Sequence, residues 1–237
     1  MQEKFLPNFH PDSLVCDSSS LISLAESCFV KVFYMLADHS KGRFLLPSGV
    51  EYECISYPLQ SKNHALSAVR LKRAVNDGKF SVVDTGQLQH LTDEIRNAGN
   101  SVFLLRGHPL KIIQQGECEM LALAHAAGLR YCLIDERTTR MLVEDPKGVK
   151  EHLAAEFHTR IDLDHRALFT FQQYTKGIAF IRSCELVARA YELGYFENYG
   201  EIKNSAFEAA MNKVKISGCS IMSQEVDDYV RYMTKKQ

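Results

Sequence analysis

Two aspartates stand directly after short apolar runs, an arrangement that places carboxylates at the end of a sheet. Asp17 follows the run at residues 13–16, and Asp135 follows the run at 130–134. Both runs are typical of buried strands. Ligands of an open parallel sheet bind at the carboxyl ends of its strands, so both carboxylates are expected to open into one crevice. Each aspartate also has the alternative role of a helix N-cap.

One glutamate, Glu117, is a further candidate for the same crevice. Glu117 lies in the first turn of the clearest expected helix, residues 116–127, which leads directly into the second of these strands. Glu53 lies on another expected helix, together with Glu51. The alternative roles are an interaction with the helix dipole for Glu117 and simple solvation for the other two.

Carboxylates that gather without cationic neighbours repel one another, and a hard divalent cation relieves the repulsion. Mg²⁺ prefers one or two carboxylates together with water and substrate phosphate. A bound metal ion lowers the pKa of water and favours in-line displacement at phosphorus. The acids by themselves therefore make metal binding the candidate function of an α/β protein.

The elements that would position these acids alternate between strands and helices. Strands are expected at residues 13–16, 43–46, 80–83, 130–134 and 178–181. Helices are expected after Ser18, from Ser48 to Pro58, and at 66–76, 88–98, 116–127, 138–143, between 182 and 194, and at 205–215 and 223–233. Residues 101–115 are ambiguous, and residues 144–175 are expected to form a partly helical insertion. The pattern predicts an α/β fold with a mainly parallel central sheet flanked by helices, in a single domain covering residues 1–237.

Composition narrows the function classes. The 237 residues carry a formal net charge of -1, which excludes nucleic-acid binding driven by bulk charge but leaves a local basic groove open. The longest apolar run, residues 28–37, is interrupted by Lys31 and is too short for a membrane span. Seven widely spaced cysteines without a Cys-x-x-Cys pair favour buried reduced thiols, and hence a cytoplasmic protein.

Four stretches in order resemble the PIN-domain nucleases, most closely their branch with a Gly-Glu-x-Glu helix. Residues 14–19 resemble the first strand with its metal-binding Asp17, and residues 46–53 resemble the Pro-x-x-Val-x-x-Glu helix start. The latter match makes Glu53 the second acid, with Glu51 as the alternative.

The other two stretches supply the third and fourth acids. Residues 116–124 resemble the Gly-Glu-x-Glu helix, with Glu117 as the acid. Residues 133–140 resemble the Asp-Asp-x-x-x-Arg stretch, with Asp135 as the acid and Glu136 where a second Asp is common. A weaker match over residues 177–194 and 204–229 places Ser183 where that branch has Thr or Ser near its active site.

The resemblance implies a metal-dependent endonuclease, most often acting on RNA, with a toxin-like or defence role. Asp17, Glu117 and Asp135 would hold Mg²⁺ or Mn²⁺, with Glu53 at the rim. The implied substrate-binding residues are Ser19, Arg137, Arg140 and Ser183. Ser19 is alternatively a helix cap, and Arg140 alternatively pairs with an acid.

The implied partners are RNA, either single-stranded or transfer RNA, a cognate inhibitor protein and a second copy of the chain. No membrane partner is implied. Two other functions stay open: a nuclease acting on DNA or structured RNA, and a degenerate PIN fold that serves as a binding or assembly module without catalysis.

Overall fold

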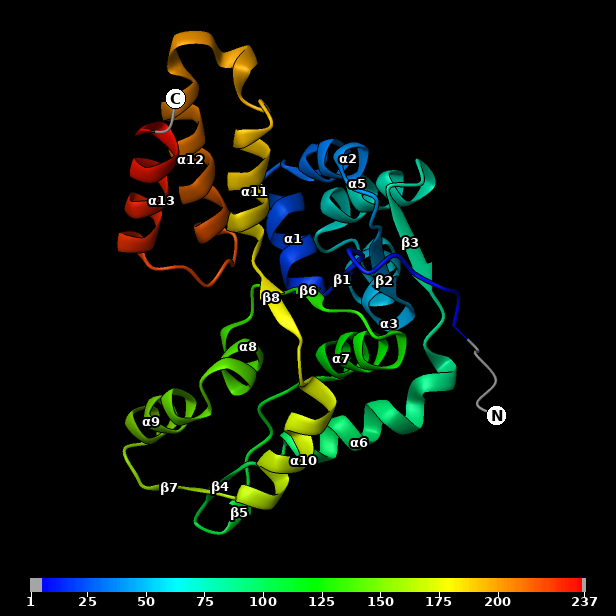
Figure 1. Cartoon of the computed structure of the whole chain (residues 1–237), viewed down its shortest axis with the longest axis vertical. Helices are drawn as coiled ribbons and strands as arrows, with labels where there is room; N and C mark the ends of the chain where they lie inside the picture. The colour runs from blue at the N-terminus through cyan, green and yellow to red at the C-terminus, as the bar shows by residue number, and fades with distance from the viewer. Residues whose placement is uncertain (1–5, 236–237) are drawn as a thin grey trace.

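The computed structural model describes residues 6–235, and its centre is a five-stranded sheet in which every strand runs parallel to its neighbours (Figure 1). The strand order is β3-β2-β1-β6-β8. The strands are Leu14–Cys16 (β1), Phe44–Pro47 (β2), Phe80–Val83 (β3), Tyr131–Leu133 (β6) and Ala179–Ile181 (β8). The predicted α/β class and all five predicted strands of this sheet are confirmed.

Helices cover both faces of the sheet, because alternate residues of the strands face opposite sides. Leu14 and Cys16 pack into one hydrophobic core, and Val15 packs into the other. The helices up to residue 144 are α1 (Ser18–Glu26), α2 (Val30–His39), α3 (Ser48–Glu51), α4 (Tyr57–Ser61), α5 (Ala65–Asn76), α6 (Gln89–Gly99), α7 (Gln115–Ala127) and α8 (Arg137–Glu144). The later helices are α9 (Pro146–Glu156), α10 (His165–Thr175), α11 (Ser183–Glu192), α12 (Lys203–Ile216) and α13 (Ser223–Lys235). Short 3₁₀ helices span Gly86–Leu88 (η2) and Glu197–Ile202 (η3), and a π-helix spans Tyr52–Ser56 (η1).

The order in which the chain adds strands to the sheet reverses between β1 and β6. The chain runs outward from β1 to β2 and β3, and then returns to add β6 and β8 on the other side of β1. Cys16 pairs with Leu133, and the backbone N–H of Asp17 donates to the carbonyl of Leu133 at 2.8 Å. Such a switch point is where open α/β sheets form their ligand crevice, so the predicted site occupies the expected edge of the sheet.

A second, three-stranded antiparallel sheet, which includes one strand of the insertion, lies at the lower end of Figure 1. It consists of β4 (Phe103–Leu105), β5 (His108–Pro109) and β7 (Ile161–Leu163). Arg106 and Gly107 both have positive φ, which gives the two-residue turn that joins β4 to β5. The insertion is therefore paired by hydrogen bonds to the segment whose structure the sequence left ambiguous.

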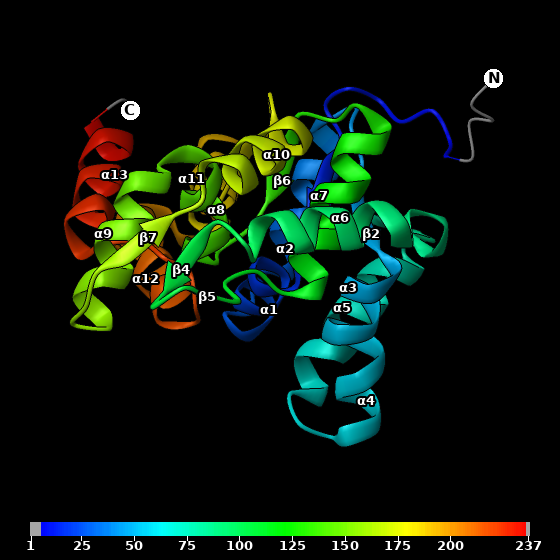
Figure 2. The same ribbon diagram turned by 90° about the horizontal axis from the view of Figure 1, so that it is seen from below.

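The helix after β2 continues past Pro58, where it was expected to end. The segments α3, η1 and α4 follow one another without a break and finish at Ser61, with Lys62 in the left-handed region. Proline normally breaks a helix because it lacks an N–H and its ring clashes with the preceding turn. The wider π-turn directly before Pro58 relieves this constraint. Figure 2 shows α4 at the end of a projection from the body of the protein, next to α3 and α5.

All seven cysteines are unpaired, and six of them are buried. No single helix within residues 6–235 is long and apolar enough to cross a membrane, although the bent pair α1 and α2 would pass by length and composition alone.

Candidate functional site

Asp17 caps the first helix at the carboxyl end of β1. Its carboxylate accepts hydrogen bonds from the backbone N–H of Ser19 at 3.0 Å and from the Ser19 hydroxyl at 2.6 Å. The same hydroxyl accepts from the backbone N–H of Asp135 at 3.1 Å. Ser19 therefore orients Asp17 and links it to the end of β6. The N-cap role considered from the sequence is confirmed for Asp17.

Glu117 lies at the start of α7, where the helix meets the same edge of the sheet. Its carboxylate accepts from the backbone N–H of Gln114 at 2.6 Å, which closes a capping box. The side chain is buried, with 7% of the residue exposed. The structure therefore brings Glu117 to the acids that follow the strands, as the sequence predicted.

Gly116 separates two of the predicted acids. A methyl group added at this glycine would lie 3.0 Å from Glu53 Oε2 and 3.9 Å from Asp17 Oδ1. These two carboxylates thus converge from different helices on the space that the missing side chain leaves. Glycine at this position keeps a cradle open between two hard oxygen donors.

Glu51, the alternative second acid, is held away from this cradle. Both of its carboxylate oxygens accept from the hydroxyl of Ser56, at 2.9 Å and 3.1 Å, and Lys72 on α5 forms an ion pair with it at 3.6 Å. Glu53, and not Glu51, is the acid that the structure places beside Asp17.

Burial dominates the electrostatics of the cluster. It raises the pKa of Asp17 to about 6, and the charge of Glu53 adds to the effect, against the hydrogen bonds from Ser19. Burial raises the pKa of Glu117 to about 7, with the charges of Asp17 and Glu136 contributing in the same direction. Like charges that face one another in a low-dielectric site favour the protonated form. The four acids Asp17, Glu53, Glu117 and Glu136 therefore form one interacting group.

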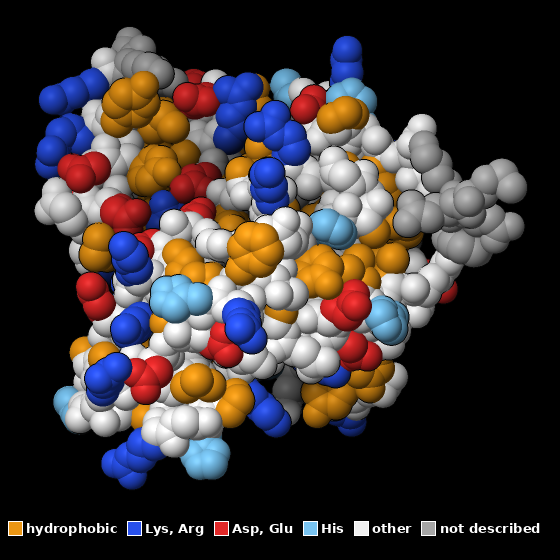
Figure 3. Space-filling view, turned by 60° about the horizontal axis from the view of Figure 1, so that its bottom comes forward, with side chains coloured by type: hydrophobic (Ala, Val, Ile, Leu, Met, Phe, Trp, Pro, Cys, Tyr) orange, Lys and Arg blue, Asp and Glu red, His pale blue; other side chains and the backbone are white. Residues whose placement is uncertain are grey.

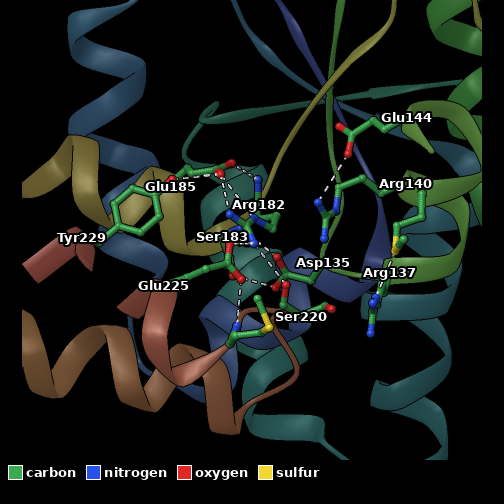
Figure 4. A network of polar contacts seen from close by, with 12 residues as sticks. Asp135, Arg137, Arg140, Glu144, Arg182, Ser183, Glu185, Ser220, Glu225 and Tyr229 are labelled. Atoms are coloured by element: carbon green, nitrogen blue, oxygen red, sulfur yellow. Dashed lines mark hydrogen bonds and ion pairs between the residues drawn. The ribbon is translucent and has the colours of Figure 1, made fainter. Parts of the chain in front are cut away.

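Asp135 is placed differently from the expectation that its carboxylate faces a metal. Its two carboxylate oxygens accept from Ser183, one from the backbone N–H at 2.8 Å and one from the hydroxyl at 2.6 Å (Figure 4). Both residues are fully buried. Asp135 thereby stabilises the start of α11, and Ser183 has no exposed surface with which to contact substrate in this conformation. The metal role of Asp135 and the substrate role of Ser183 stay predictions.

Glu136 directly follows Asp135 and is, after Asp17, a second acid whose charge raises the pKa of Glu117. It caps α8 by accepting from the backbone N–H groups of Thr138 at 2.7 Å and Thr139 at 2.6 Å. The sequence singled out Glu136 as a departure from the family pattern and did not place it in the site. Its position next to Asp135 is the signal that would have found it.

Glu119 is a buried acid whose role the sequence did not reveal. It accepts from the backbone N–H of Gly49 at 3.0 Å, from Thr85 Oγ1 at 3.0 Å and from Gln115 Nε2 at 3.1 Å. A methyl group at Gly49 would approach its oxygens to 2.4 Å, so glycine is required for this contact. The second glutamate of the Gly-Glu-x-Glu helix is a structural residue that ties α7 to α3. A glutamate within a run of buried apolar residues is the sequence signal for such a role.

A groove beside Asp135 carries the basic residues of the site, and we call it the α8–α13 groove. Its volume is about 540 Å³. The lining residues are Arg137, Arg140, Met141, Glu144, Asp145, Arg182, Lys215, Cys219, Ser220, Ile221, Met222 and Glu225.

The arginines of this groove differ in how firmly they are held (Figure 4). Arg182 forms ion pairs with Glu185 at 2.9 Å and Glu225 at 3.1 Å, so it is structural. Arg140 pairs with Glu144 at 3.4 Å, which confirms the alternative role considered for it. Its buried Nε, however, has no hydrogen-bond partner among the described residues. Arg137 is exposed, and it donates a hydrogen bond to a soft acceptor, Met141 Sδ, at 3.0 Å.

The donor set at the cradle fits a hard divalent cation. Among the described residues, no three Asp, Glu, His or Cys side chains stand ready as a complete ligand set. Magnesium sites in proteins commonly use only one or two carboxylates, with water and phosphate as the other ligands. Asp17 and Glu53, converging on the space above Gly116, supply that number of oxygen ligands.

No family model, no curated protein and no solved structure matches this chain, so the reading of the site rests on its own residues and geometry.

Proposed function

We propose that the chain is a PIN-type, metal-dependent nuclease that hydrolyses phosphodiester bonds, with RNA as its substrate. The observation that carries the proposal is the convergence of Asp17, Glu53 and Glu117 at the β1–β6 switch point. Asp17 and Glu117 are buried, and the exposed Glu53 adds a like charge beside Asp17. Such an arrangement destabilises the fold, so its presence favours a function in binding and chemistry.

Asp17 and Glu53 would hold Mg²⁺ or Mn²⁺ over Gly116. When bound, the cation would supply charge stabilisation at the phosphate and a more acidic water. Asp135 would add to the ligand set through lone pairs that Ser183 does not use, since each carboxylate oxygen accepts more than one bond.

The chain's own residues have distinct parts in this proposal. Ser19 fixes the carboxylate of Asp17 in one orientation through its two hydrogen bonds. Glu117, with a pKa of about 7, holds or releases a proton at its carboxyl group near neutral pH, which suits proton transfer in hydrolysis. Arg137 and Arg140 would contact substrate phosphates from the α8–α13 groove.

Local charge, and not net charge, would guide the substrate. On the face shown in Figure 3, Lys and Arg side chains are interspersed with Asp and Glu and form no continuous basic field. With a formal net charge of -1, the chain has little long-range attraction for RNA. This balance fits a nuclease that acts on a restricted target, as a toxin with a cognate inhibitor or a defence nuclease would.

Cleavage assays test the proposal directly. Labelled single-stranded RNA, transfer RNA and single-stranded DNA are incubated with the protein in Mn²⁺, in Mg²⁺ and in EDTA. Asp17→Asn removes one proposed ligand. Asp38→Asn on α2 is the matched control, because Asp38 is exposed and forms an ion pair with Lys79 at the surface.

Metal-dependent cutting by the wild type and Asp38→Asn, lost in Asp17→Asn, supports the nuclease, and the substrate that is cut identifies its class. Cleavage that persists in EDTA or in Asp17→Asn would show that the acids have no role in catalysis. No cutting of any substrate would favour the binding or assembly module.

A further inference from the structure

Two exposed tyrosines lie on the helical segment that carries Glu53. Tyr52 is 54% exposed and Tyr57 is 55% exposed. Their ring centroids are 6.1 Å apart and the ring planes are tilted by 43°. The two rings form an aromatic pair whose outer faces stand in solvent.

The π-helix η1 is what brings the two rings together. The backbone N–H of Tyr57 donates to the carbonyl of Tyr52, which closes a turn of five residues. In an α-helix of 3.6 residues per turn, residues five apart point roughly 140° away from each other. The wider π-turn returns the fifth residue to the same face. Ser56 and Glu51, which are also five residues apart, meet across this turn in the same way.

The opposite face of this segment fixes the direction in which the tyrosines point. Val50, Cys54 and Ile55 are buried in the core with at most 2% exposure. The segment therefore cannot rotate to hide the two rings. A rare helical geometry that holds two aromatic rings in solvent is the kind of local departure found at functional sites.

The position of the two tyrosines relative to the acids indicates which ligand would cover their rings. Glu53 directly follows Tyr52, and its carboxylate reaches toward Gly116 and Asp17. Tyr57 follows Glu53 by four residues, which is about one helical turn. A phosphate at the acids would therefore have its neighbouring nucleotides next to the two rings.

We propose that Tyr52 and Tyr57 form a stacking platform for unpaired bases of a single-stranded nucleic acid that flank the scissile phosphate. The inference rests on the proposed function and narrows its substrate class. Base–aromatic stacking tolerates any sequence because every base has a π-face. Paired bases within a duplex do not offer these faces, so the platform selects single strands over duplexes.

A binding experiment without metal tests the platform apart from catalysis. A short labelled oligouridylate is titrated in EDTA with the wild type and with Tyr52→Leu/Tyr57→Leu, which keeps apolar surface but removes the π-systems. Tyr52→Phe/Tyr57→Phe keeps the rings. Tyr232→Leu on α13 is the matched control, because that tyrosine is 57% exposed on a different helix. An abasic oligonucleotide of equal length keeps the charge and removes the bases.

We expect the leucine double variant to bind oligouridylate roughly 10-fold to 100-fold more weakly than the wild type. The phenylalanine variant and the control should bind as the wild type does. The abasic strand should bind the wild type and the leucine variant equally weakly. The chain has no tryptophan but ten tyrosines, so the part of the tyrosine quenching that is lost in the leucine double variant reports stacking on Tyr52 and Tyr57.

Two results would overturn the inference in distinguishable ways. If the wild type binds oligouridylate and the leucine variant binds it equally well, the platform is wrong and the nuclease proposal stands. If the wild type binds no oligouridylate, the proposed function loses its support together with the platform. Sedimentation of the same variants tests a protein contact instead, since exposed Leu59 lies on α4 and exposed Leu66 and Val69 lie on α5. A change in association state with unchanged binding of oligouridylate would assign the tyrosines to a protein contact.

Discussion

Ser183 engages both carboxylate oxygens of Asp135, one through its backbone N–H and one through its hydroxyl. The two residues stand at the ends of the neighbouring strands β6 and β8, and neither is exposed. A buried carboxylate is tolerated only when its oxygens are satisfied, and here a helix start supplies the donors. The pair connects the edge of the sheet that carries the acids to α11.

Ser183→Ala should therefore destabilise the fold by about 1–3 kcal/mol, because it leaves one oxygen of a buried charge without its donor. Urea unfolding measures the change. Ser183→Thr keeps the hydroxyl and should retain most of the wild-type stability. In the Asp135→Asn background the cost of Ser183→Ala should shrink, and an unchanged cost would mean that the contact contributes little.

Asp17→Asn should abolish cleavage and leave the fold at least as stable as the wild type. The substitution removes a buried charge that faces Glu53, while the amide oxygen can still accept from the Ser19 backbone. At pH 8 the gain in stability should be at most about 3 kcal/mol, since one pKa unit corresponds to about 1.4 kcal/mol. Thermal unfolding at that pH checks this. Loss of the folded state would identify Asp17 as a structural residue and remove it from the site.

Stability should fall as pH rises from about 4 to about 7. Asp17 and Glu117 have folded-state pKa values of about 6 and about 7, above the ordinary values of 3.8 and 4.5. The folded chain therefore binds more protons than the unfolded chain in this window, and the stabilisation is complete at acid pH and lost above the folded pKa values. The free energy of unfolding at pH 5 and pH 8 measures the effect. The fall should be much smaller in Asp17→Asn/Glu117→Gln, and an equal fall there would place its origin elsewhere.

Mn²⁺ should raise the thermal midpoint at pH 8 by mass action, because it binds the folded chain at carboxylates that otherwise repel one another. Gly116→Ala should suppress this shift, since its methyl group would lie 3.0 Å from Glu53 Oε2 in the cradle. Without metal the variant should be as stable as the wild type or slightly more so, because alanine costs less chain entropy than glycine in a helix. A full Mn²⁺ shift in Gly116→Ala would place the metal outside the cradle.

The strand ends of the main sheet could be predicted from the sequence because their signals are local. Asp17 directly follows β1, and the apolar run before Asp135 forms β6. Parallel pairing then places both residues at one edge without further information. The same reasoning placed Glu117, because a helix that precedes a parallel strand must begin at that edge.

The rest of the site depends on contacts between distant parts of the chain. The partner of Asp135 lies 48 positions away, and the Glu119 contact with Gly49 spans 70. The second sheet was missed because β5 has two residues, both exposed, and carries no periodic apolar signal. The helix end predicted at Pro58 was wrong, because the π-turn before it is a change in backbone geometry that cannot be predicted from residue types.

The hydrogen bonds of Glu119 have a consequence for how the acids are assembled. One buried carboxylate ties the start of α3, which leads to Glu53, and the hydroxyl of Thr85 to the helix that carries Glu117. The spacing between those two acids is thus set while the chain folds, with no ligand needed to draw the helices together. The acids are therefore preorganised by folding. A bound ion or phosphate would not lose binding free energy to the ordering of these helices.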